Sequence, residues 1–116
     1  MNKAQVVFLG DISLNEQYVE MYKKGLNPFL TIANDLFFSN IVIGNLECMA
    51  KGNQGENLHK KPRLTTTQET LNYLNTLNVN LVSLAHNHIY DHLENGFIKT
   101  TDFLNKNNID YLGASL

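Results

Sequence analysis

Three short polar clusters in this chain carry the residue types of a metal-dependent site, and each follows directly after an apolar run. The clusters are Gly10-Asp11, Asn45-Leu46-Glu47 and Asn87-His88. Carboxylate and amide oxygens are ligands of hard divalent cations, and an imidazole can exchange a proton near neutral pH. The sequence therefore predicts a site in which Asp11, Glu47 and Asn87 bind Mn²⁺, Fe²⁺, Zn²⁺ or Mg²⁺ beside His88.

The apolar runs before these clusters are typical of strands in an α/β fold. They cover residues 6–9, 41–44 and 81–85, and a fourth run follows at 109–113. Helical patterns separate them, which predicts right-handed crossovers, a mainly parallel sheet of about four strands, and helices that cover its faces. Ligands of such sheets bind outside the carboxyl ends of the strands, so we expect the three clusters to converge there.

Helices are expected over residues 16–24 and 28–37, from the capping pattern Thr66-x-x-Glu69 onward, and from Asp91 to about residue 106. Asn15 and Asn27 are the expected caps of the first two. The second helix is rich in large apolar residues and should be deeply buried, and the strand at 6–9 should be buried on both faces. Residues 48–65 lack periodicity and predict a long surface loop.

Each polar residue also has a purely structural interpretation. Asp11 and Glu47 could cap loops and Asn87 could hold a turn, although three clusters at successive strand ends favour a functional site. Asp91 could orient a metal ligand or cap a helix, and the sequence leaves both open. His86 and His92 are expected to be solvated, whereas Cys48 is expected to be a small, at least half-buried residue.

Composition limits the classes of protein to consider. With 116 residues, 43% of them hydrophobic, the chain predicts one domain over residues 1–116. Its net charge of −2 argues against nucleic acid as a partner. The first apolar run has only four residues, too few for a signal peptide or a membrane segment, so the chain as given is expected to be cytoplasmic.

The ordered motifs resemble the CapA family of poly-γ-glutamate capsule biosynthesis proteins, which is similar in fold to the calcineurin-like metallophosphoesterases. The resemblance rests on Gly10-Asp11-Ile12-Ser13-Leu14, Asn45-Leu46-Glu47, Ser83-Leu84-Ala85-His86-Asn87-His88-Ile89-Tyr90-Asp91 with Gly96 after it, and Ile109-x-Tyr111-x-Gly113-Ala114. It implies the first half of a metallophosphoesterase-like four-layer sandwich, so the chain is expected to be the amino-terminal portion of a larger domain.

The resemblance also implies roles for individual residues. Asp11, Glu47 and Asn87 would be metal ligands, and His88 would be the catalytic histidine that touches the phosphate or protonates the leaving group. The implied function is metal-dependent hydrolysis of a phosphoester or related bond in an anionic small molecule or polymer, within capsule or cell-envelope polymer synthesis. Metallophosphoesterases commonly carry a histidine two residues after the first aspartate, where this chain has Ser13.

A second functional class remains open beside the hydrolase. Ser13 and an ending directly after a strand favour a non-catalytic component of a polymer-synthesis assembly with an incomplete metal site. Such a sheet would self-associate or bind a partner that completes it. The basic stretch 59–63 could contact an anionic substrate, but it is expected to be a solvated face.

Overall fold

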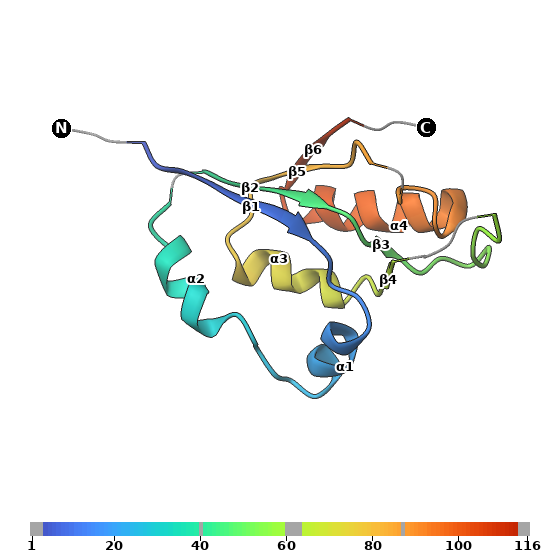
Figure 1. Cartoon of the computed structure of the whole chain (residues 1–116), viewed down its shortest axis with the longest axis horizontal. Helices are drawn as coiled ribbons and strands as arrows, with labels where there is room; N and C mark the ends of the chain where they lie inside the picture. Colours follow the sequence, from blue (N-terminus) through green and yellow to red (C-terminus); the bar gives the residue numbers. More distant parts are fainter. Residues whose placement is uncertain (1–3, 40, 60–63, 87, 114–116) are drawn as a thin grey trace.

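The computed structural model describes residues 4–39, 41–59, 64–86 and 88–113. In chain order the elements are β1 (Val6–Ile12), α1 (Gln17–Lys23), α2 (Leu30–Leu36), β2 (Ile41–Leu46), β3 (Met49–Ala50), β4 (Thr65–Thr66), η1 (Thr70–Asn72), α3 (Tyr73–Thr76), β5 (Leu81–Ser83), α4 (Leu93–Lys106) and β6 (Asp110–Leu112). Figure 1 shows their arrangement.

A four-stranded parallel sheet in the order β1-β2-β5-β6 forms the centre of the fold. The four runs expected to be strands all pair in it, and the α/β class is confirmed. Helices α1 to α4 lie on the lower side of the sheet in Figure 1. Their apolar side chains join Val42 and Val82 of the sheet in one core, which includes Leu74 of α3 and Leu104 of α4.

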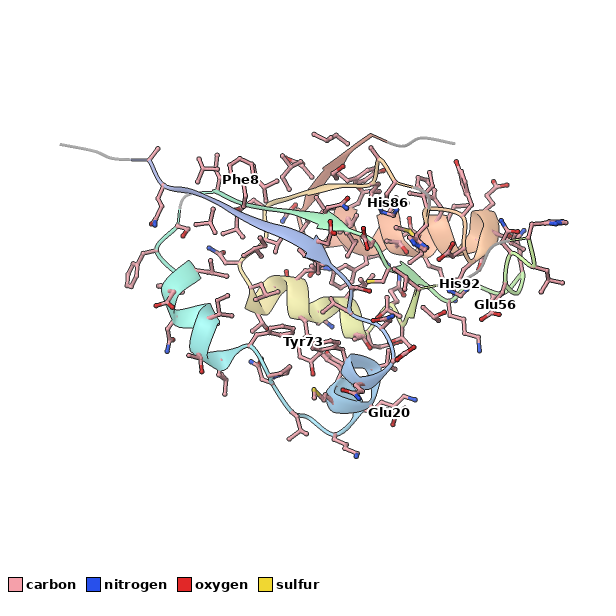
Figure 2. The ribbon with its side chains drawn as sticks, viewed as in Figure 1. Phe8, Glu20, Glu56, Tyr73, His86 and His92 are labelled. Atoms are coloured by element: carbon pink, nitrogen blue, oxygen red, sulfur yellow. The ribbon has the colours of Figure 1, made fainter. Side chains whose placement is uncertain are left out.

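The other face of the sheet is bare among the described residues. Val6, Phe8, Ile41 and Leu112 are exposed, and Phe8 keeps 75% of its surface in contact with solvent. Figure 2 shows Phe8 on the upper side of the sheet and the buried Tyr73 on the helical side. The predictions that helices cover both faces and that the 6–9 strand is buried on both are therefore wrong. Side chains alternate along a strand, so only half of those in β1 reach the helices.

Helix α2 lies at the rim of the molecule, and its predicted deep burial is also wrong. Leu36 is its one buried residue, whereas Phe37 and Phe38, directly after the helix, are 71% and 83% exposed. The helix also begins later than predicted, at Leu30 with Phe29 as its N-cap and no side-chain cap, while Asn27 Oδ1 accepts the Phe29 N–H at 3.0 Å just before it. An apolar pattern shows that a helix can bury a face, but only the neighbouring elements determine whether that face is covered.

The segment 48–65 begins as buried structure, contrary to the predicted surface loop. Residues 48–50 are fully buried, and β3 pairs in parallel with β4 as a second, two-stranded sheet. Helix α4 packs on β3, where the Ala50 N–H donates to Thr100 Oγ1 at 2.8 Å. Residues 51 and 53–56 are exposed, as a surface loop requires.

Like Asn27, the other predicted helix caps do not form. Helices α1 and α4 have no side-chain cap hydrogen bond, so Asn15 and Asp91 do not cap them. In place of Thr66, Thr67 Oγ1 accepts the Thr70 N–H at 3.1 Å. These side chains are thereby available for other contacts, and that of Asp91 lies in the candidate site. No helix in the described part of the chain is long and apolar enough to cross a membrane.

Candidate functional site

A bulge in β1 places Asp11 at the carboxyl end of the sheet. Phe8 pairs with Ile43 and Asp11 with Asn45, so β1 holds one residue more than β2 between these two pairs. Gly10 lies in the bulge with a φ of +76°, a left-handed conformation that costs glycine little. The extra residue brings the Asp11 side chain to the same row of the sheet as Asn45.

Asn45 joins the two predicted carboxylate ligands. Its Nδ2 donates to Asp11 Oδ1 at 2.9 Å and lies 3.4 Å from Glu47 Oε1. The Glu47 backbone N–H donates to Ile12 O at 2.9 Å, which fixes Glu47 beside the end of β1. Asp11 and Glu47 therefore converge as the strand-end pattern predicts, although no sequence signal showed that the Asn45 amide would bridge them.

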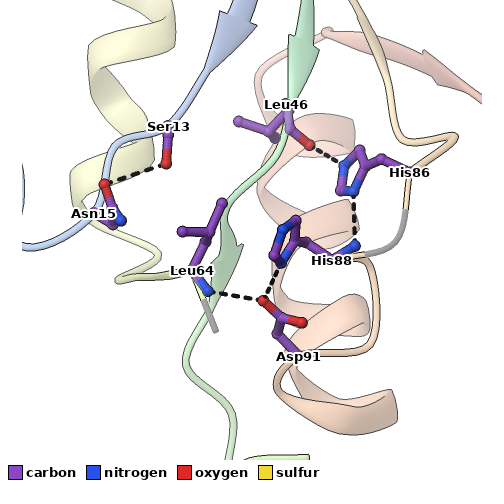
Figure 3. Close-up of polar contacts among 7 residues, drawn as sticks. All are labelled: Ser13, Asn15, Leu46, Leu64, His86, His88 and Asp91. Atoms are coloured by element: carbon purple, nitrogen blue, oxygen red, sulfur yellow. Dashed lines mark hydrogen bonds and ion pairs between the residues drawn. The ribbon is translucent and has the colours of Figure 1, made fainter. Parts of the chain in front are cut away.

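His88 forms a close pair with Asp91. The distance from His88 Nδ1 to Asp91 Oδ2 is 2.7 Å, and the side chains are 14% and 0% exposed. The same carboxylate oxygen accepts the Leu64 N–H at 2.8 Å, as Figure 3 shows. Of the two interpretations left open for Asp91, the cap is excluded, and its side chain contacts the predicted catalytic histidine.

His86 connects this pair to the end of β2. Its Nδ1 accepts the His88 backbone N–H at 3.1 Å, and its Nε2 makes a short hydrogen bond with Leu46 O (Figure 3). With Nδ1 accepting, Nε2 must carry the proton and donate it to the carbonyl. Both nitrogens of His86 are thus engaged, which makes the ring a structural link and leaves no nitrogen for a metal. The expected solvation is wrong for His86, which is partly buried, and for His92, which is fully buried.

The remaining predicted positions are Asn87, Ser13 and the basic stretch. Asn87 lies outside the described residues. Ser13, which stands where metallophosphoesterases commonly have histidine, donates its hydroxyl to Asn15 Oδ1 at 3.2 Å (Figure 3). Within the described ranges no group of three or more His, Cys, Asp or Glu side chains gathers as a metal centre. Of the basic stretch, His59 is exposed, and residues 60–63 are outside the described part.

The sequence matches the family model of the bacterial capsule synthesis protein PGA_cap over residues 5–116. The chain belongs to the PGA_cap family. This confirms the family resemblance carried by the motifs at the strand ends, and it makes this a protein of bacterial capsule synthesis. No curated protein matches the chain.

Cys48 of this PGA_cap chain is next to Glu47 but is not a nucleophile. Its side chain is fully buried, and its Sγ accepts the Leu14 N–H at 3.2 Å. Burial raises the pKa of the Cys48 thiol to about 12. The thiol is therefore protonated at neutral pH, and the expected role as a small buried residue is confirmed.

Proposed function

We propose that this PGA_cap chain contributes a metal-dependent hydrolase site for a phosphoester or related bond in an anionic substrate of capsule polymer synthesis. The observation that supports this most directly is the meeting of Asp11 and Glu47 around one amide, linked through Leu46 and His86 to the His88–Asp91 pair. Two carboxylates beside an oriented imidazole are the parts that hydrolysis of a phosphoester needs.

In this proposal the Asp11 and Glu47 carboxylates bind a divalent cation. Asp11 Oδ1 and Glu47 Oε1 both lie within 3.4 Å of the Asn45 Nδ2 atom, so the two carboxylates are neighbours at the end of the sheet. Oxygen donors of this kind suit Mg²⁺ or Mn²⁺. In the proposal Asp11, Glu47 and Asn87 hold the cation. When bound, it would neutralise charge on the phosphoryl oxygens and activate a water for attack.

His88 provides the proton for the leaving group in this proposal. Its Nδ1–H donates to Asp91, so the proton to be transferred is on Nε2 of the protonated ring. As the bond from phosphorus to the leaving oxygen breaks, Nε2 gives its proton to that oxygen, and the ring is left neutral. The proton that water loses on attacking the phosphorus can later restore the protonated imidazole.

Calorimetric titration with Mn²⁺ tests the metal site. We expect saturable binding by the parent chain, and Asp11→Ala should weaken it by at least about 100-fold, because even indirect partners of metal ligands are worth 10–100-fold. Asp35→Ala removes an exposed carboxylate of α2 and is the matched control. It should bind as the parent does. Equal binding by a folded Asp11→Ala variant, or none by the folded parent, would refute the proposed site.

The bare sheet face favours a second candidate function, that of an assembly component without catalysis. Parallel sheets almost always have both faces covered, whereas here Phe8, Ile41 and Leu112 are exposed on one face. This face can cover itself in a symmetric pair, because the same apolar residues would meet around a two-fold axis. The occupant we propose for it is a second copy of the chain.

Sedimentation equilibrium tests this second candidate. Phe8→Ser should weaken self-association by at least about tenfold, since a central aromatic residue of an interface contributes more than 1 kcal/mol. Leu58→Ser is the control, because Leu58 is equally exposed but lies in the 51–59 segment. A parent that stays monomeric throughout the concentrations used for metal binding would refute self-association through this face.

A further inference from the structure

Asp91, just before α4, is buried and makes hydrogen bonds through both its side chain and its backbone. Its side chain is fully buried, and Oδ2 accepts both the His88 ring proton at 2.7 Å and the Leu64 N–H at 2.8 Å. Its backbone oxygen accepts the Asn57 N–H at 2.8 Å, and its backbone N–H donates to His88 O at 3.1 Å. Leu64 thus helps to fix the carboxylate of Asp91, and Asn57 and His88 help to fix its backbone.

A purely structural role does not account for this arrangement. Asp91 caps no helix, and its Oδ1 is buried with no hydrogen-bond partner among the described residues. An unpaired buried oxygen of a carboxylate costs free energy that an apolar side chain would avoid. The one side chain that gains from the carboxylate is the imidazole of His88.

The hydrogen bond determines which nitrogen of His88 carries a proton. An ionised carboxylate can only accept, so Nδ1 must be the donor, and in the neutral ring Nε2 then has the free lone pair. The backbone of His88 is fixed separately, by the bond from its N–H to His86 Nδ1. The ring and the main chain are therefore oriented by two different neighbours.

We propose that Asp91 is a positioning residue that keeps His88 in the Nδ1–H tautomer, with Nε2 as the reactive nitrogen. The catalytic consequence rests on the function proposed above, because only a reacting His88 would make the choice of nitrogen matter. The tautomer itself is a property of the free chain. It can be measured without metal or substrate.

Nitrogen-15 NMR of the imidazole groups in the full chain tests this directly, with the His88 signals assigned by their loss in His88→Gln. We expect the parent to show the Nδ1–H form of His88 under conditions in which the nitrogen-15 shifts report a neutral ring. Asp91→Ala removes the acceptor altogether, so His88 should no longer be held in the Nδ1–H form. Asp102→Asn, at an exposed position of α4, should leave the parent pattern unchanged.

The outcomes separate the positioning role from the proposed function. His88 in the Nε2–H form in the parent, or an Nδ1–H form unchanged in Asp91→Ala, would overturn the positioning role. Should Asp91→Ala not fold, the tautomer of the parent still decides. The expected tautomers together with a roughly 10²–10⁴-fold lower turnover in Asp91→Ala would support both proposals. The expected tautomers in a chain without hydrolytic activity would support the positioning and refute the hydrolase.

Discussion

His88→Ala is expected to lower kcat for a phosphoester substrate by roughly 10²–10⁴-fold, the usual contribution of a positioned acid or base. The imidazole is the group that the structure orients towards proton transfer, through the 2.7 Å contact with Asp91. Because the carboxylates of Asp11 and Glu47 are untouched, binding of Mn²⁺ should persist. Steady-state hydrolysis of an aryl phosphate and calorimetry on the same samples measure both effects.

A second histidine serves as the control for this experiment. His59 is exposed, and its described hydrogen bond is made by its backbone N–H, so His59→Ala should keep the parent kcat. If His88→Ala hydrolyses the phosphate as fast as the parent, the acid role is wrong. Loss of Mn²⁺ binding along with turnover would instead assign His88 to the metal, and it would also contradict the proton-transfer role.

Gly96→Ala is expected to reduce the free energy of unfolding by about 1–3 kcal/mol, the range found for added groups in tightly packed places. A Cβ at position 96 would lie 2.5 Å from His92 Cβ and 2.8 Å from Ala50 O. Ala50 O belongs to the backbone, and His92 Cβ is bonded directly to the backbone, so neither atom can move away by a side-chain rotation. The substitution must push α4 from β3, and denaturant unfolding followed by circular dichroism measures the cost.

Glu94→Ala is the control in the first turn of the same helix, at an exposed position where the substitution shortens a side chain. It should change the free energy of unfolding by no more than about 0.5 kcal/mol. Because His92 adjoins Asp91, Gly96→Ala should also disturb the His88–Asp91 pair and lower turnover. An unaltered unfolding curve for Gly96→Ala would show that α4 and β3 do not approach as closely as described.

The bulge at Gly10 illustrates how far the sequence could predict the site. A glycine between an apolar run and an aspartate indicated the end of a strand, and parallel strands with a common carboxyl edge implied that Asp11 and Glu47 would meet. The structure brings both within reach of Asn45. The amide bridge depends on register, and a pairing shifted by one residue would turn every side chain to the other face.

The contacts of His86 and Asp91 were beyond the reach of the sequence. Local patterns favoured solvent for His86 and left Asp91 open between a helix cap and a residue that orients a metal ligand. The observed contacts are instead with atoms distant in the chain: His86 contacts Leu46 O, and Asp91 accepts the Leu64 N–H. Only folding brings those atoms together, and a buried polar group takes whichever partner is in reach.

The sequence by itself determined the α/β class, the four strands, the family and the clustering of polar residues at the strand ends, because these follow from local apolar runs and short motifs. Only the tertiary structure decided that the helices lie on one side of the sheet, leaving Phe8 bare and α2 at the rim. The physical reason is that the apolar periodicity of a helix or strand predicts which of its faces can be buried. Which of them are covered depends on neighbours that no local pattern specifies.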